Sequence, residues 1–307
     1  MDYFTFILTN NVLPIFLIVG AGALVNYFFN LDVKSLSRLY LYIMVPAFMF
    51  NQLYNTEISM QLLGSVILFM VVFLFLLYII GHGVGRLLKD GKSMENAFTN
   101  SIMFYNSGNY GIPLITLAFK NNPVAISIQV IVLLVQNISN FTLGAFQAGD
   151  KGDGFKQTLK GIAKLPSIYA LILALSLRLL NIDIWQPVAT SVEYMSQAMI
   201  AVALLTLGAQ LTSTKFDFEL SVLFSNAIRL VGGPVIALLI IKLLDFHGLL
   251  AQVLFVSAGL PTAVNTVVLS LEYDSNPDFA SKAVFSATLL SAFTETILIY
   301  VAQNFIN

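Results

Sequence analysis

Charged residues are scarce in this sequence: only 10% of its 307 residues are Asp, Glu, Lys or Arg, and 58% are hydrophobic. Soluble domains usually contain about one charged residue in four. The mean hydropathy of +0.85 points the same way. We therefore predict an integral membrane protein that contacts the lipid bilayer. The net charge of −1 provides no basic surface, so no nucleic-acid partner is expected.

Cysteine is absent, and histidine occurs only at His82 and His247. The absence of cysteine excludes disulfides and thiolate metal sites, and neither histidine has a second ligand at metal-binding spacing. The sequence also lacks a nucleophile–His–Asp set, a His-Glu-x-x-His motif and a glycine-rich phosphate loop. We therefore expect no enzymatic activity, no metal site and no cofactor.

Apolar runs long enough to cross a bilayer recur ten times, since a spanning helix needs about 20 such residues. The predicted spans are residues 4–29, 36–54, 61–88, 96–119, 124–147, 159–180, 187–211, 219–244, 249–272 and 278–305. A polar insert, AGDKGDGFKQ, separates the fifth span from the sixth. We therefore predict three segments: a first repeat at 1–147, a cytoplasmic linker at 148–158 and a second repeat at 159–307.

The two halves resemble each other. LPIFLIVGAGALV begins at Leu13, and LPSIYALILALSL begins at Leu165. LAFKNNPVAIS (117–127) matches LEYDSNPDFAS (271–281), including a shared Asn-Pro pair. Chance similarity between apolar helices is the alternative explanation. Two repeats of five spans each enter the membrane with opposite polarity, and such inverted repeats are typical of secondary transporters. The predicted fold is thus all-α, with ten transmembrane helices in two inverted repeats.

Lysine and arginine in short loops predict the orientation, because cytoplasmic loops are enriched in both. Only Lys120, Arg178 and Lys242 fall outside if the N-terminus is extracytoplasmic. The same choice places the following residues on the cytoplasmic side: Lys34, Arg38, Arg86, Lys89, Lys92, Lys151, Lys156, Lys160, Lys164, Lys215 and Lys282. We therefore expect a multi-pass protein of the cell membrane with both termini extracytoplasmic.

Helix-breaking residues interrupt the fourth and ninth predicted spans, in YNSGNYGIP (105–113) and SAGLPTAVN (257–265). Proline removes a backbone donor, and unpaired backbone groups in hydrocarbon cost several kcal/mol each. Broken backbone is therefore tolerated where it is buried in protein or lines a polar cavity. Interruptions at corresponding positions of two halves indicate a transporter's binding site, and the helix starts that follow them favour an anion.

Residues in and beside these breaks are the candidate substrate-binding residues. They are Asn106, Asn109, Gly111, Pro113, Pro261, Thr262 and Asn265. The alternative is a pair of proline kinks without a ligand.

Two ionisable residues, Arg229 and Glu295, lie deep inside predicted spans. A charge in the membrane costs at least about 2.5–3.5 kcal/mol on insertion scales, so such residues usually pair or take part in transport. Three interpretations are open. Arg229 and Glu295 form a buried ion pair, Glu295 takes up a coupling proton or sodium ion, or Glu295 faces a water-filled vestibule or another subunit.

NSGNYGIPL in the fourth span resembles the Asn…Gly-x-Pro-Leu motif of the auxin efflux carrier family, which includes PIN-like and bacterial malate-permease-like transporters. LPTAVNTVVLSLEYDSNPDFASKAVF (260–285) and RLVGGP (229–234) are similar to further segments of that family. The resemblance covers essentially the whole chain. It implies ten spans in two inverted repeats, broken helices four and nine that cross, elevator-type movement and often a homodimer.

The same resemblance places the family's crossover asparagine on Asn106, its crossover prolines on Pro113 and Pro261, and its pocket glutamine on Gln136. Plant carriers also use an acidic residue and a lysine in the third span. Here the third span has none before its cytoplasmic end, and the long cytoplasmic loop of plant members is missing. A compact carrier of a bacterial cytoplasmic membrane is therefore indicated.

The sequence thus predicts a secondary active transporter of elevator type. Its cargo would be a small organic anion such as a dicarboxylate or an auxin-like carboxylate, with H⁺ or Na⁺ as the coupling ion. The alternative is a sodium-coupled organic anion symporter of the bile-acid-carrier type, in which the same amides and carbonyls would ligate sodium. A channel is a further class.

Overall fold

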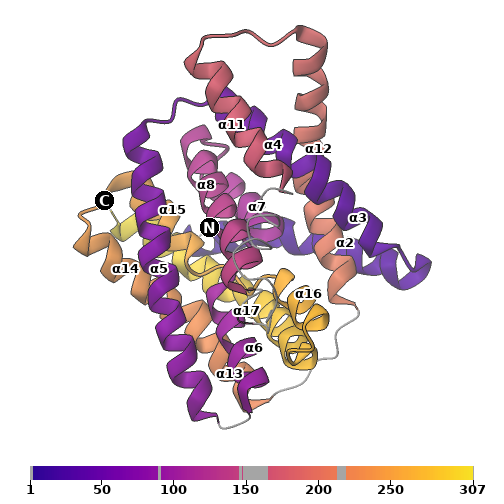
Figure 1. The fold of residues 1–307 in the computed structure, drawn as a ribbon, viewed down its shortest axis with the longest axis vertical. Helices are drawn as coiled ribbons and strands as arrows, with labels where there is room; N and C mark the ends of the chain where they lie inside the picture. The colour runs from indigo at the N-terminus through magenta and orange to yellow at the C-terminus, as the bar shows by residue number, and fades with distance from the viewer. Residues whose placement is uncertain (1–2, 89–90, 145–146, 148–164, 213–218, 307) are drawn as a thin grey trace.

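The computed structural model describes residues 3–88, 91–144, 147, 165–212 and 219–306. Within these residues the regular structure is entirely helical (Figure 1). Six helical stretches of the described residues are long and apolar enough to cross a membrane: Tyr3–Phe29, Met60–Leu87, Pro123–Gly144, Gln186–Leu211, Leu220–Leu243 and Pro277–Phe305. The all-helical membrane character predicted from the sequence is thus confirmed.

Two of these stretches contain a π-helical turn between α-helical parts, and Pro123–Gly144 ends in one. The first half of the chain contains α1 (Tyr3–Ile7), η1 (Leu8–Val12), α2 (Leu13–Phe29), α3 (Val33–Leu39), η2 (Tyr40–Met44), α4 (Val45–Asn55), α5 (Met60–Leu87), α6 (Gly91–Met103), η3 (Ser107–Gly111), α7 (Ile112–Ala118), α8 (Pro123–Ser139) and η4 (Asn140–Gly144). The predicted fourth span is thus two helical pieces, α6 and η3–α7, which explains why no single long helix covers it.

The second half also combines short and long helices. It contains α11 (Pro166–Leu179), α12 (Gln186–Leu211), α13 (Leu220–Ala227), η5 (Ile228–Gly232), α14 (Gly233–Leu243), α15 (Gly248–Ser257), α16 (Asn265–Glu272) and α17 (Pro277–Phe305). The predicted ninth span is again two pieces, α15 and α16. The predicted linker 148–158 lies outside the described residues.

The Asn-Pro pair shared by the two halves starts a long helix in each. The side-chain oxygen of Asn122 accepts hydrogen bonds from the amides of Val124 (2.9 Å) and Ala125 (3.2 Å) at the start of α8. Asn276 accepts one from the amide of Phe279 (3.3 Å) at the start of α17. Asparagine satisfies free helix-terminal amides, and proline fits the first helical position. The repeated pair therefore sets the same helix boundary twice.

Buried apolar side chains form two main clusters among the described residues. The smaller joins α4, α11 and α12 to α8, through residues such as Met49, Ala174, Met199 and Val130. Of these helices, α4 and α12 lie on the right of Figure 1 together with α2, which packs along α12. The larger cluster joins helices of both halves, with Phe73 of α5 among its members. The two broken segments belong to this larger cluster.

Candidate functional site

The chain is interrupted in both segments where glycine and proline predicted it. The first break separates α6, which ends at Met103, from η3, which begins at Ser107. The second separates α15, which ends at Ser257, from α16, which begins at Asn265. These interruptions occur in the interior of the protein, since Phe104, Tyr105 and the other residues of the first break are buried. The local prediction of two broken helices is therefore confirmed.

The two breaks pair with each other through their backbones. Tyr105 and Thr262 form an isolated antiparallel β-bridge. The amide of Asn106 donates to the carbonyl oxygen of Pro261 (2.7 Å), and the amide of Ala263 donates to that of Phe104 (2.9 Å). Each break thereby satisfies backbone groups that the other has freed, as the low-dielectric interior requires. We call residues 104–106 and 258–264 the crossover.

Asn106 organises the first break. Its side-chain oxygen accepts a hydrogen bond from the amide of Asn109 (3.1 Å), and its carbonyl oxygen accepts one from Gly111 (2.9 Å). Its side-chain Nδ2 is buried without a hydrogen-bond partner. A buried donor of this kind costs free energy unless something occupies it. Asn106 is therefore the candidate residue with an open donor, whereas Asn109 lies beside it and is only partly buried.

Two glutamines on one face of α8 reach the first break. Gln136, which was predicted, donates from Nε2 to the carbonyl of Met103 at a long 3.4 Å. Gln129, which sequence reasoning missed, donates to the carbonyl of Ser107 (2.9 Å) and accepts a hydrogen bond from Ser257 Oγ (2.5 Å). Gln129 thus joins the first break to the helix that ends at the second. The seven-residue spacing to Gln136, two helical turns, was the signal that could have revealed it.

Gly111 and Pro113 shape the restart of the helix after the first break. A Cβ added to Gly111 would lie 2.5 Å from Nε2 of Gln129 and 2.7 Å from Cδ1 of Leu260. Only glycine leaves that space for the glutamine. Pro113 lies in the first turn of α7, where its missing amide costs no helical hydrogen bond. Both residues support the crossover rather than presenting a polar group to a ligand.

The second break places its predicted residues differently. Thr262 is buried, and its Oγ1 donates to the carbonyl of Ser101 in α6 (2.9 Å). Pro261 supplies the carbonyl that receives Asn106. Asn265 begins α16 and is partly exposed. The structure therefore brings Asn106, Pro261 and Thr262 into one connected network.

Arg229 reaches the crossover from η5 and is fully buried. Its Nη1 donates to the carbonyl of Ile102 (2.6 Å), and its Nη2 donates to the carbonyl of Ala258. Its guanidinium carbon lies 4.8 Å from the ring centroid of Tyr105. Within the described chain these carbonyls, and not Glu295, are the hydrogen-bond partners of Arg229.

Glu295 of α17 is fully buried, and both of its carboxylate oxygens are without a hydrogen-bond partner among the described residues. A Cβ added to Gly259 in the second break would lie 3.5 Å from its Oε1. The direct Arg229–Glu295 salt bridge, one of the three interpretations, is not formed within the part of the chain that the structure describes. Glu295 nevertheless lies beside the crossover.

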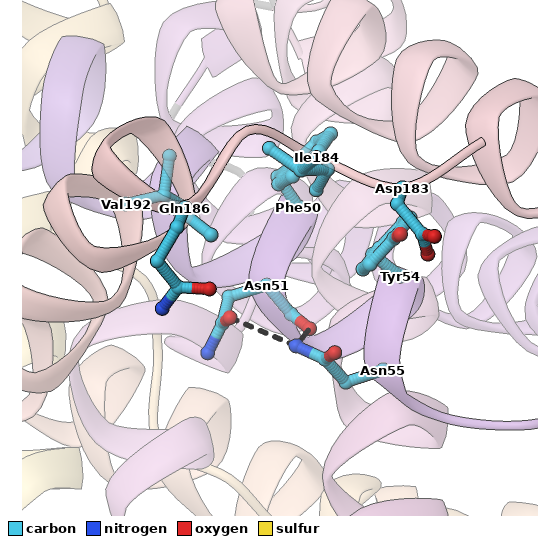
Figure 2. Close-up of a pocket in the computed structure, with 9 residues that line it drawn as sticks. Phe50, Asn51, Tyr54, Asn55, Asp183, Ile184, Gln186 and Val192 are labelled. Atoms are coloured by element: carbon cyan, nitrogen blue, oxygen red, sulfur yellow. Dashed lines mark hydrogen bonds between the residues drawn. The ribbon is translucent and has the colours of Figure 1, made fainter.

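A separate pocket of about 300 Å³ lies between the end of α4 and the segment that leads into α12 (Figure 2). Its lining includes Asn51, Asn55, Asp183 and Gln186, and Asn55 donates to the side-chain oxygen of Asn51 (2.9 Å). None of the predicted site residues lines this pocket. The candidate site remains the crossover.

The sequence matches the Membrane transport protein family over residues 7–299. The chain therefore belongs to this family, the auxin efflux carriers, and is a membrane transporter.

Relatives support the same class. An "Uncharacterized transporter" of Methanocaldococcus jannaschii is 26% identical over 91% of this chain and 95% of its own length. One of Methanothermobacter thermautotrophicus is 23% identical over 92% of this chain and 94% of its own length. A Rhizobium meliloti protein named "Putative malonate transporter" is 23% identical over 97% of this chain and 96% of its own length.

Proposed function

We propose that this transporter is a secondary active carrier of a small organic anion, such as a dicarboxylate, across the cytoplasmic membrane. The observation that carries the proposal is the meeting of two broken helices around Asn106, whose buried amide donor has no partner. The name of the Rhizobium meliloti relative, which mentions malonate, supports a dicarboxylate cargo.

The crossover offers two kinds of anion-binding group. Side-chain amides come from Asn106 and Asn109 at the first break and from Asn265 at the second. The helices that resume after each break, η3–α7 and α16, begin at the crossover and carry the positive end of their dipoles there. In our proposal each break binds one carboxylate of the cargo, as half-helix starts do in broken-helix carriers.

The proposed architecture has ten spans in two inverted repeats, 1–147 and 159–307, with both termini extracytoplasmic. It is supported by the broken helix in each half and by the long helix with an Asn-Pro start that follows it. We further propose elevator-type movement, in which α2, α4, α11 and α12 stay fixed while the helices around the crossover move. The smaller apolar cluster, which contains residues of α4, α11 and α12, and the packing of α2 along α12 support it. We also propose a homodimer in which the fixed helices form the contact between the two subunits.

Uptake of labelled malonate into proteoliposomes tests this function. We expect saturable uptake that accelerates when unlabelled dicarboxylate is trapped inside, because a carrier exchanges cargo and a channel does not. A thermal-shift screen of the purified protein against dicarboxylates, monocarboxylates and indole acids identifies the cargo class. Large single-channel currents without exchange would contradict a carrier.

Asn265→Ala probes the second break. Asn265 lies at a helix start and is partly exposed, so its loss leaves the fold intact while removing a donor from the cargo. We expect uptake to fall at least about tenfold, the effect of losing one buried hydrogen bond. Asn304→Ala is the matched control, because Asn304 is exposed and contacts only its own helix through the carbonyl of Tyr300 (2.7 Å). Equal uptake by both variants would contradict a role for Asn265.

A further inference from the structure

Arg229 holds the ends of two half-helices at once. Ile102, whose carbonyl receives Nη1, lies in the last turn of α6, and Ala258, whose carbonyl receives Nη2, terminates α15. The arginine comes from a third segment, η5, and its guanidinium also lies 5.6 Å from the ring centroid of Phe73. One cation thus bridges the two helix ends that stop at the crossover.

The C-terminal ends of helices interact favourably with a cation. The last carbonyls of a helix have no amide partner within the helix and together carry a partial negative charge. Here two such ends come together in the buried interior of a membrane protein. In broken-helix carriers such carbonyl ends can coordinate a coupling sodium ion. In this chain the carbonyls of Ile102 and Ala258 are already occupied by a guanidinium.

Gly233 leaves space for the guanidinium of Arg229. A Cβ added to Gly233, four residues further on, would lie 2.6 Å from Nη2 and 2.6 Å from the Ala258 carbonyl oxygen. Glycine at this position therefore leaves room for the contact. Guanidinium is planar and forked, so it donates to two acceptors together, which the single ammonium of lysine does less well. The Arg-x-x-x-Gly pattern in RLVGGP thus has a geometric explanation.

We propose that Arg229 is a resident cation that takes the place of a coupling sodium ion at the paired carbonyl ends of α6 and α15. The proposal rests on the carrier function above and deepens it, because it excludes sodium coupling through these carbonyls. The carboxyl of Glu295 lies beside the crossover but does not bind the guanidinium within the described chain. The carrier therefore keeps its crossover assembled in sodium-free solution, and its transport does not require sodium.

The first test uses the unaltered protein. Thermal unfolding and malonate uptake are each measured in sodium chloride and in N-methylglucamine chloride of equal ionic strength. We expect the same unfolding temperature and the same uptake rate in both salts. An unfolding temperature or an uptake rate that rises with sodium would overturn the proposal.

The second test removes the cation. Arg229→Ala leaves two helix ends without a partner, so we expect an unfolding temperature several degrees lower and a strong loss of uptake. Low-millimolar guanidinium, or sodium, should then raise the unfolding temperature of this variant by refilling the site. An Arg229→Ala protein with the original unfolding temperature, or one that neither cation stabilises, would contradict a resident cation.

Two further variants separate the loss of the cation from crowding at the site and from the loss of the forked guanidinium. Gly233→Ala crowds the guanidinium but retains it, so this variant should be destabilised without being rescued by added guanidinium. Arg229→Lys keeps the charge but not the fork, and we expect an unfolding temperature between those of the original protein and Arg229→Ala. If Arg229→Ala yields no folded protein, an uncharged Arg229→Gln protein as stable as the original would overturn the proposal. Thermal unfolding requires no cargo. If malonate is not transported but the unfolding results are as expected, the proposed function fails while the resident-cation proposal stands.

Discussion

The crossover and the contact between α2 and α12 both join the first half of the chain to the second, but they do so by different means. At the crossover, backbone amides of each half donate to carbonyls of the other. Along α2 and α12 the backbones themselves touch. A Cβ on Gly22 would strike the carbonyl of Leu205, and one on Gly208 would strike the carbonyl of Val19.

This difference indicates different roles for the two contacts: the crossover offers polar groups to a ligand, whereas the α2–α12 contact packs helices together. Glycine contacts let helices approach closely and gain from van der Waals packing in a membrane, and they present no polar group to a ligand. Among the described residues, Asn106 in the crossover instead has an unpartnered side-chain amide, and Glu295, which lies beside the crossover, has an unpartnered carboxyl. We therefore propose the crossover as the binding region and the α2–α12 contact as its support.

Breaking the support should have the largest effect on stability. Gly22→Ala forces a methyl group against the backbone of α12, which no side-chain rotation can relieve, so we expect a loss of about 3 kcal/mol, the upper part of the range for overpacking. Gly20→Ala, two residues away on the same helix, meets nothing within 4 Å and should be neutral. Denaturation in detergent micelles measures both. Equal stability of the two variants would contradict a stabilising close contact between α2 and α12.

Breaking the binding region should affect transport before stability. Asn106→Ser keeps an oxygen that can cap the amide of Asn109 but removes the free Nδ2 donor, since serine caps helices about as well as asparagine. We expect malonate uptake to fall about tenfold to hundredfold, the cost of one buried hydrogen bond of about 1–3 kcal/mol. The unfolding temperature should stay within a few degrees. Asn106→Ala removes both functions and should also lose stability.

The smallest expected effects come from the two glutamines of α8. Gln129→Leu removes the hydrogen bonds to Ser107 and Ser257, so we expect a loss of about 1–2 kcal/mol in unfolding free energy. Gln136→Leu removes the long contact to Met103 and should cost less. Chemical denaturation of both variants checks the order. If Gln136→Leu instead abolishes uptake at full stability, Gln136 is a cargo contact, as first predicted.

Much of the architecture could be predicted because membrane helices follow simple local rules. Apolar length identified the continuous helices, glycine and proline identified both breaks, and the Asn-Pro pairs marked the starts of α8 and α17. These signals depend on nearby residues alone. The π-helical turns inside the long helices had no such signal.

The contacts of the site could be predicted only in part, because they join residues far apart in the chain. Arg229 was recognised as an unusual intramembrane charge, but its acceptors are carbonyls, which every residue carries and no sequence pattern distinguishes. Gln129 had a signal in its spacing to Gln136, but its partners, the carbonyl of Ser107 and Ser257 Oγ, lie far from it in the chain. Only the fold reveals which carbonyl is left free.

The mutual pairing of the two breaks has a consequence for synthesis. Asn106 is made long before Pro261, its backbone partner, and Phe104 long before Ala263. At about 5–20 residues per second, the delay is roughly 8–30 s. During that time the freed groups of the first break need a substitute partner, such as water or the insertion machinery. Chains truncated before residue 261 would keep this need permanently, and quality-control proteases would remove them.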